Sequence, residues 1–275
     1  MTRVIRQVRM YSLFAGSAVQ TVLTYRINFY LFILGGILKT FVAYYLWKAI
    51  FNSTSMTSLN GFTLNEMVVY ILMSIITARL LGSEVDMVVA AEVQQGSIAI
   101  NLIRPISYRL RLFFMSLGDA ISGFITVAMP LWAGLVVIRY VTVKEPIPDI
   151  QTLMAYLFSL ILAFIIQFLF NYCFGMMAFY VTYMWGLSFL KRAVISFLSG
   201  QIIPFAFFPL RLQWLMNFVP FGSTNYIPVM IYLKKYTGMQ ALTAIGIQAL
   251  WVIVLFIASH LVWKNAVRHL TILGG

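Results

Sequence analysis

The sequence predicts an all-α integral membrane protein. Between Asp149 and Lys191 the chain runs for 41 residues without a charged side chain, and only lipid can bury such a segment at low cost. Four further apolar runs share the chain, and most charged residues lie in the gaps between them. Hydrophobic residues make up 62% of the chain and charged residues 9%, against roughly 25% charged in soluble domains. Five to seven helices of about 20 residues would leave only short loops, so we expect a single transmembrane domain over residues 1–275.

The N-terminal segment, residues 1–26, is expected to form a helix that lies along the membrane surface. At 100° per residue, one side of a helix over residues 2–20 is apolar and the opposite side is basic. The apolar side consists of Val4, Val8, Tyr11 and Ala15, and the basic side of Arg3, Arg6 and Arg9. A basic amphipathic helix lies in the interface rather than crossing the bilayer. The alternative is a basic leader that only sets the orientation of the chain.

Six transmembrane helices follow from the apolar runs and the polar breaks between them. A polar stretch over residues 52–60 separates the first span from the second, and a loop over residues 139–151 separates the third from the fourth. The uncharged run is too long for one untilted helix, so we divide it at residues 180–185, where aromatic side chains typical of a membrane interface gather. The predicted spans are residues 27–48, 63–82, 112–138, 152–180, 190–208 and 241–263.

The basic residues are distributed as expected for a multi-pass protein of the cell membrane with both termini in the cytoplasm. In that orientation 12 of the 19 Lys and Arg residues flank the cytoplasmic ends of spans, six flank the outer ends, and Lys39 lies within the first span. The inner set is Arg3, Arg6, Arg9, Arg26, Arg79, Arg104, Arg109, Arg111, Lys191, Arg192, Lys264 and Arg268. The excess agrees with the positive-inside rule. Because the charges flank apolar runs and form no single patch, the net charge of +12 does not indicate nucleic-acid binding.

The cytoplasmic loop over residues 84–111 is predicted to carry a short helix that docks on a partner. Gly96 should interrupt one short helix, Ser97 can cap the next, and Pro105 should end that helix before the third span begins. A short helix across the membrane surface with exposed polar ends suits docking into a groove of another protein. The alternative is a polar connector without a partner.

Residues 204–235 are predicted to form two short helices that enter the outer leaflet and return. Four prolines at this spacing, Pro204, Pro209, Pro220 and Pro228, cannot lie in one straight helix, because each lacks a backbone donor. The segment is nevertheless too apolar for a solvated loop. Irregular backbone at membrane depth is tolerated only where protein or a cavity shields it, and a re-entrant pair of helices satisfies both conditions.

These motifs, in this order, resemble those of the type-2 ATP-binding-cassette (ABC) permease family, the membrane subunits of ATP-driven transporters. The family's coupling-helix loop has the pattern Glu-x-x-x-Gly-(Ser/Thr)-x-x-x-x-Leu-x-x-Pro, which is matched here by Glu92, Gly96, Ser97, Leu102 and Pro105. The chain departs from the family at Val93, where a basic residue is common. The family's Ser-Gly, Pro and Pro near the end of the fifth span are matched by Ser199, Gly200, Pro204 and Pro209. With six spans and the N-terminal helix, the resemblance covers nearly the whole chain.

The resemblance implies a permease subunit that pairs with a second permease chain, identical or related, and with ATP-binding cassette subunits. It implies export of an apolar or amphipathic substrate. The residues expected to contact the ATP-binding subunit are Glu92, Gln95, Gly96, Ser97, Leu102, Arg104 and Pro105, and those expected in the re-entrant gate are Ser199, Gly200, Pro204, Pro209 and Pro220. The sequence has no Gly-x-x-x-x-Gly-Lys-(Ser/Thr) phosphate loop, so we expect no ATPase activity on this chain and assign ATP and Mg²⁺ to the partner subunit.

Two charged residues inside the predicted spans leave the transport mechanism open. Lys39 lies about 13 residues into the first span, and Asp119 lies in the third. A charge within the membrane is costly unless it is paired, so both residues are candidates for a polar translocation path. The alternative is that Lys39 snorkels to the interface and that Asp119 makes an internal ion pair or a helix-cap contact.

Two other functional classes follow from the same residues. An ion-coupled secondary transporter would use Lys39 and Asp119 as a charge relay, although that class normally shows internal repeats and none is evident here. An intramembrane enzyme is disfavoured because it needs convergent acid–base, nucleophilic or metal-binding groups. The single cysteine, Cys173, and the two histidines, His260 and His269, do not provide a Cys- or His-based metal centre.

Overall fold

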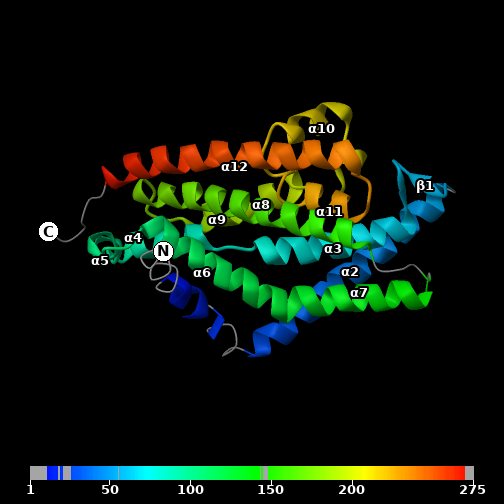
Figure 1. Ribbon diagram of the computed structural model, residues 1–275, viewed down its shortest axis with the longest axis horizontal. Coiled ribbons are helices and arrows are strands. Elements are labelled where there is room, and N and C mark those ends of the chain that lie inside the picture. Colours follow the sequence, from blue (N-terminus) through cyan, green and yellow to red (C-terminus); the bar gives the residue numbers. More distant parts are fainter. Residues whose placement is uncertain are drawn as a thin grey trace.

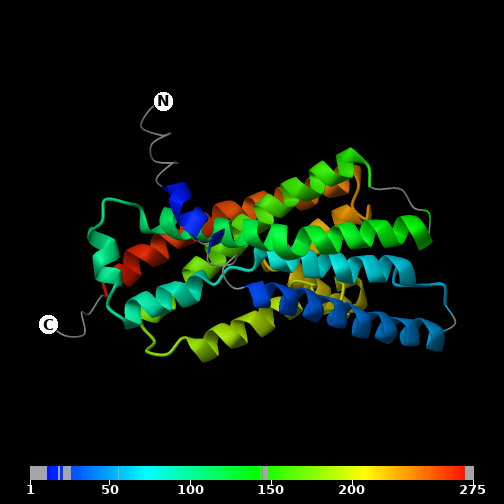
Figure 2. The ribbon, with the colours of Figure 1, turned by 90° about the horizontal axis from the view of Figure 1, so that it is seen from below.

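Within the part of the chain that the structure describes, five helical segments of the computed structural model are long and apolar enough to cross a membrane (Figures 1 and 2). The structure describes residues 11–17, 19–20, 26–54, 56–142, 144 and 148–269. The five segments are Ile33–Thr54, Leu64–Gln94, Tyr108–Val141, Ile150–Phe179 and Gly238–Val267. They overlap the predicted first, second, third, fourth and sixth spans, and the second extends to residue 94 rather than ending near residue 82. The helical membrane class is therefore confirmed.

The first and last of these segments each lie in one helix, and the others combine several elements. Helix α2 spans Arg26–Thr54 and α12 spans Gly238–Val267. The second segment contains α3 (Leu64–Leu81) and α4 (Val85–Gln94). The fourth contains α8 (Ile150–Gly175) and the short 3-10 helix η2 (Met176–Phe179). Helix α8 contacts α3, α4, α12, α6 (Tyr108–Gly123) and α11 (Tyr226–Tyr232). The bundle is therefore built around α8.

The third segment changes direction near its middle (Figure 1). It consists of α6 (Tyr108–Gly123), the π-helical turn η1 (Phe124–Ala128) and α7 (Met129–Thr142). Pro130, in the first turn of α7, cannot donate a backbone hydrogen bond and crowds the preceding turn, which explains the wider π turn there. A Cβ on Gly123 would lie 3.3 Å from Cζ of Arg79, so this glycine allows α6 to approach α3 closely.

The predicted fifth span, residues 190–208, is not among the five segments. Helix α9 (Trp185–Leu198) has 14 residues and is about 21 Å long, whereas the hydrocarbon core is about 30 Å thick. It ends because Gly200 adopts a φ of +74°, which a right-handed helix cannot contain, and Pro204 follows. A sixth transmembrane helix is therefore not confirmed.

Two short helices follow α9, as predicted for residues 204–235. After the 3-10 turn η3 (Phe205–Phe207) come α10 (Leu210–Asn217) and α11 (Tyr226–Tyr232). All seven residues of α11 are buried, whereas α10 exposes large apolar side chains such as Leu210 and Trp214. Both helices lie in the half of the bundle that holds strand β1 (Ser58–Leu59), away from α4 and α5 (Ile98–Ile103) (Figure 1). This arrangement fits a re-entrant pair, whose depth in the membrane stays a prediction.

A hairpin connects the first two segments. Strands β1 (Ser58–Leu59) and β2 (Phe62–Thr63) pair antiparallel across Asn60 and Gly61, whose φ angles of 46° and 83° are those of a tight hairpin turn. Thr63 then caps α3 in a capping box with Glu66. The start of α3 is thereby fixed at the end of the bundle opposite α4.

The predicted N-terminal surface helix lies only partly within the described residues. Residues 11–17 are helical, and Tyr11 is buried. Its hydroxyl accepts a hydrogen bond of 2.8 Å from the backbone N–H of Ser107, and its ring stacks on Phe114. Val4, Val8 and the three predicted basic residues lie outside the described residues, so the amphipathic helix itself is not confirmed.

Candidate functional site

The loop between the second and third segments contains two short helices separated by a glycine turn. Helix α4 ends at Gln94, and Gly96 adopts a φ of +69°, the left-handed conformation that glycine tolerates best. Helix α5 ends at Ile103, because Arg104 takes the extended conformation that a following proline favours. The helix breaks predicted at Gly96 and Pro105 are confirmed.

The predicted capping role of Ser97 is wrong. Ser97 occupies the N-cap position of α5, but its φ and ψ of −65° and −15° are helical rather than extended. Its side chain is directed back to α4, where the hydroxyl donates to the backbone oxygen of Glu92 at 3.4 Å. Helix α5 therefore begins without a side-chain cap.

Glu92 ties the loop to the start of α6. Its carboxylate accepts hydrogen bonds from Nη2 of Arg111 at 2.6 and 2.8 Å and from the hydroxyl of Tyr108 at 2.7 Å. The side chains of Arg111 and Glu92 are only 9% and 14% exposed. Charge-assisted hydrogen bonds of this kind are short and stronger than those between neutral groups. Glu92 thus holds α4 against α6, and its carboxylate is already engaged within the chain.

A second, more deeply buried ion pair joins α4 to α9. Nζ of Lys191 lies 2.7 Å from Oδ2 of Asp86, and the hydroxyl of Ser188 donates to the same oxygen at 2.6 Å. Lys191 also donates to Oδ1 of Asn171 in α8 at 2.9 Å, and Asn171 donates to the backbone oxygen of Ser83 at 2.9 Å. The network connects the start of α4 to both α8 and α9.

The close approach of α4 to α8 depends on a glycine. A Cβ on Gly175 would lie 3.0 Å from Cα of Asp86 and 3.3 Å from Cβ of Val89.

Sequence reasoning did not identify Asp86. The signal available was an acidic residue in the first turn of an apolar helical segment, but its partner lies more than 100 positions away and could not be inferred.

Helix α5 presents an apolar surface to its surroundings. Ile100 is 56% exposed and Ile103 is 83% exposed, and their i, i+3 spacing places them on one face. On the opposite side Ile98 is buried, and Leu102 packs against the apolar cluster that joins α4, α6, α8 and α12. The sequence analysis missed Ile100 and Ile103, although two isoleucines at helical spacing in a polar loop are a usable signal.

The predicted coupling residues divide into two groups. Gln95, Gly96, Arg104 and Pro105 are exposed around α5. The other three, Glu92, Ser97 and Leu102, are only partly exposed and make contacts within the chain. The structure therefore brings all seven to one end of the bundle, with four of them fully accessible to a partner.

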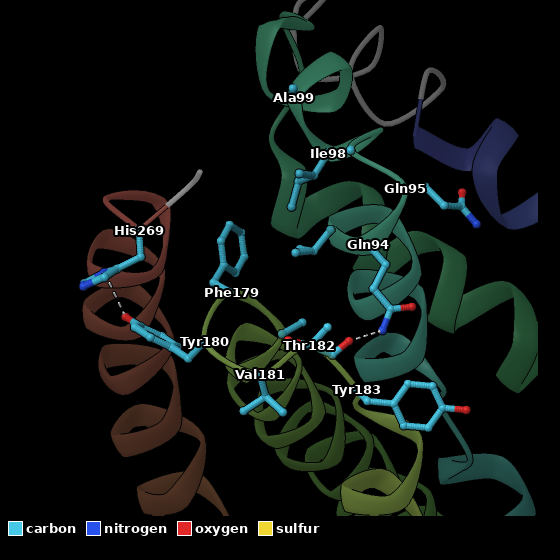
Figure 3. A pocket seen from close by; sticks show the side chains of 13 residues that line it. Gln94, Gln95, Ile98, Ala99, Phe179, Tyr180, Val181, Thr182, Tyr183 and His269 are labelled. Atoms are coloured by element: carbon cyan, nitrogen blue, oxygen red, sulfur yellow. Dashed lines mark hydrogen bonds between the residues drawn. The ribbon is translucent and has the colours of Figure 1, made fainter. Parts of the chain in front are cut away.

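A cavity of about 460 Å³ opens beside this surface (Figure 3). One wall is the α4–α5 turn, the other is the segment 178–183 that connects α8 to α9, and His269 after α12 lies at the edge. Nε2 of Gln94 donates to the backbone oxygen of Thr182 at 2.7 Å, and the hydroxyl of Tyr180 lies 3.3 Å from Nδ1 of His269. Three separate parts of the chain thus form one recess next to α5.

A second cavity is open to the surface, and most of the residues in its wall are polar or charged. It has a volume of about 550 Å³ and is lined by residues of α3, α6, α8 and α9 and of the segments that precede α10 and α11. The charged residues in its wall are Arg79, Glu84, Asp119, Lys191 and Arg192. Arg79 and Asp119 interact electrostatically within it. We refer to it as the polar cavity.

The two candidate residues of the translocation path occupy different surroundings. Asp119 lines the polar cavity. Lys39 is exposed on α2, does not line that cavity, and forms no ion pair with any residue that the structure describes. This placement fits a snorkelling lysine and does not provide a relay between Lys39 and Asp119.

Three of the predicted gate residues, Ser199, Gly200 and Pro204, follow the end of α9. Gly200 has its carbonyl oxygen bonded by the hydroxyl of Tyr70, and a Cβ on Gly200 would lie 3.0 Å from the ring of Phe205. Phe205 stacks on Tyr226 with ring centroids 4.2 Å apart. Ser199 and Pro204 are buried beside them, while Pro209 is exposed as the N-cap residue of α10 and Pro220 is half-buried after it.

A comparison with family models identifies the chain. The model described as ABC-2 family transporter protein matches residues 37–274. No curated protein sequence matches significantly. The matched region contains most of the first apolar helical segment, the other four segments, the α4–α5 loop and the polar cavity. The chain therefore belongs to the ABC-2 family of transporter proteins, as a multi-pass permease subunit.

Proposed function

We propose that this permease is driven by separate ATP-binding cassette subunits that dock on α5. A partner surface would cover the exposed Ile100 and Ile103 and reach into the recess beside the α4–α5 turn. The observation that carries this proposal is the apolar pair on α5, because α5 follows directly after α4, which two buried ion pairs tie to the rest of the bundle. ATP and Mg²⁺ would be bound by the partner subunit.

We expect the two ion pairs to transmit a displacement of α5 to the walls of the polar cavity. A displacement of α5 moves α4, and α4 is joined to α6 by Glu92 and Arg111 and to α9 by Asp86 and Lys191. Helices α6 and α9 both line the polar cavity. Closure of the ATP-binding subunits would therefore tilt two walls of this cavity together and change the side to which it opens.

We further propose that the transporter is an exporter of an amphipathic or apolar substrate and that it works with a second permease chain, identical or related. The family resemblance of the coupling loop and of the re-entrant segment supports both points. The position of Lys39 outside the polar cavity gives the ion-coupled alternative no support.

Replacement of Ile103 by Ser tests the docking surface. The matched control is Ile150→Ser, since Ile150 is 74% exposed at the start of α8, at the other end of the bundle. After purification in mild detergent, we expect the parent and I150S to retain an ATP-binding subunit and I103S to lose most of it. Equal retention by I103S and the parent would refute docking at α5.

A further inference from the structure

We propose that a small cavity between α6 and α12 binds the head group of an anionic phospholipid and that Arg109 recognises it. The cavity has a volume of about 270 Å³ and is lined by Ser107 and by residues of α6, α8 and α12. We refer to it as the α6–α12 pocket. Its volume lies below the range of about 300–1,000 Å³ that is usual for drug-sized ligands, which suits a head group whose acyl chains remain outside.

Arg109 carries a charge that no carboxylate of the described residues compensates. It is half-buried, lines the α6–α12 pocket and forms no ion pair with any residue that the structure describes. Glu92, which bonds the neighbouring Tyr108, is already engaged by Arg111. A cation beside apolar surface in a membrane protein is costly unless an anion pairs with it. An anionic ligand would supply the missing charge.

The guanidinium group of Arg109 is held in place with part of its hydrogen-bonding capacity unused. Nη1 donates to the hydroxyl of Ser259 at 3.0 Å, and Cζ lies 4.5 Å from the ring centroid of Phe256. Both partners belong to α12, so the side chain extends from α6 to the opposite wall of the pocket. Nε and Nη2 make no hydrogen bond to the described residues, and neither atom is enclosed by them. These two nitrogens form the planar fork that binds phosphate oxygens.

The surroundings of the pocket favour a lipid over a soluble anion. The exposed apolar side chains of this part of α12 are Ile253, Phe256, Ile257 and Leu261. Exposed basic residues, Lys264 and Arg268, follow them along the helix. The pocket lies at this boundary, and its wall contains tyrosine and tryptophan side chains typical of a membrane interface. Basic pockets between transmembrane helices bind anionic head groups. The acyl chains can therefore lie along the apolar face of α12 while the head group contacts Arg109.

Lipid binding measured by native mass spectrometry tests the charge requirement. The full-length protein in mild detergent would be titrated with phosphatidylglycerol, which is anionic, and with phosphatidylcholine, which carries a phosphate but no net charge. With identical acyl chains, we expect the first molecule of phosphatidylglycerol to bind about tenfold more tightly, which corresponds to one charge-assisted contact. Glycerol phosphate distinguishes the sources of the phosphate group, because it lacks acyl chains. We expect it not to bind at the same concentration.

Arg109→Gln tests the recognising residue. Glutamine can donate hydrogen bonds but carries no charge, so we expect the preference for phosphatidylglycerol over phosphatidylcholine to disappear. Lys264→Gln is the matched control, because it removes the same charge from an exposed position of α12 outside the pocket, and it should keep the preference of the parent. Arg109→Lys restores the charge and should regain part of the preference. A purely structural role of Arg109 would instead weaken the binding of both lipids equally.

Equal affinities of the parent for the two lipids would overturn the proposal, and this result needs no variant should R109Q fold poorly. An unchanged preference in R109Q would also overturn it. So would an equal loss in K264Q, because it would indicate attraction to surface charge in general. Binding of glycerol phosphate as tight as that of phosphatidylglycerol would assign the pocket to a soluble anion and refute the lipid assignment. These measurements use the permease alone, so docking of ATP-binding subunits on α5 stands or fails separately.

Discussion

Lys191 and Asp86 form a buried ion pair with a nitrogen–oxygen distance of 2.7 Å, and their side chains are 5% and 1% exposed. The pair joins α9 to α4 at the point where the loop that carries α5 enters the bundle. A buried pair is rarely a large net stabiliser, but it fixes the relative position of the elements that it joins. Here those elements are α4, which leads into α5, and a wall of the polar cavity.

Removal of one member of this pair should be more damaging than removal of both. Lys191→Met leaves a buried carboxylate without its partner, and we expect a loss of about 3–5 kcal/mol in unfolding free energy. The double variant Asp86→Leu with Lys191→Met should recover most of that loss, as measured by thermal unfolding in detergent. It should still show weaker stimulation of ATP hydrolysis, because the link between α4 and α9 is absent. Additive losses in the double variant would contradict this account.

Glu92→Gln should loosen the α4–α5 loop without unfolding the bundle. The change removes the charge that pairs with Arg111, whose side chain is 9% exposed. Hydrogen exchange should become faster across residues 95–104. Glu84→Gln is the matched control, since the Glu84–Arg192 pair is more than half exposed and such pairs contribute about 0–1 kcal/mol. Unchanged exchange in E92Q would show that this carboxylate does not position the loop.

Gly200→Ala should destabilise the end of α9. Its φ of +74° is unfavourable for alanine, and the new Cβ would lie 3.0 Å from Phe205 and 3.1 Å from the hydroxyl oxygen of Tyr70. We expect a loss of about 1–3 kcal/mol. Gly246→Ala in α12 should instead stabilise by about 0.5–1 kcal/mol, because nothing lies within 4 Å of its Cβ position and the helix favours alanine. Urea unfolding in detergent compares the two, and effects of equal sign would contradict the prediction.

The pair of Asp149 and Lys234 should make stability depend on pH in acid. Hydrogen bonds from Lys234 and then Thr152 lower the pKa of the Asp149 carboxyl to about 2, against about 3.9 in an unfolded chain. The folded pKa is the lower one, so this contribution is complete above about pH 4 and is lost as the pH falls towards 2. The parent should lose stability over that window at low salt, and Asp149→Asn should lose less. Identical acid profiles would exclude a role for the pair.

The apolar helices and their breaks could be predicted because hydropathy, glycine and proline act locally. Five predicted spans correspond to helical segments, and Gly96 and Pro105 bound α5 as expected. The predicted fifth span was longer than α9, since an apolar run does not reveal that Gly200 leaves the helical conformation.

The contacts that form the site could not be predicted from the sequence, because they join segments that are far apart in the chain. Glu92 was identified as a contact for a partner, yet its carboxylate binds Arg111 and Tyr108. Nothing in the local sequence shows that Asp86 lies against Lys191, which is more than 100 positions away. Such roles depend on which distant side chains the fold brings together.

Cross-linking at α5 tests the central claim most directly. In a Cys173→Ala background, Ile103→Cys and Ile150→Cys would each be labelled with a photoactivatable maleimide in native membranes, and the captured proteins identified by mass spectrometry. The account predicts that position 103 captures an ATP-binding cassette subunit and that position 150 does not. Capture of such a subunit at position 150, or its absence at position 103 in membranes that contain it, would contradict docking on α5.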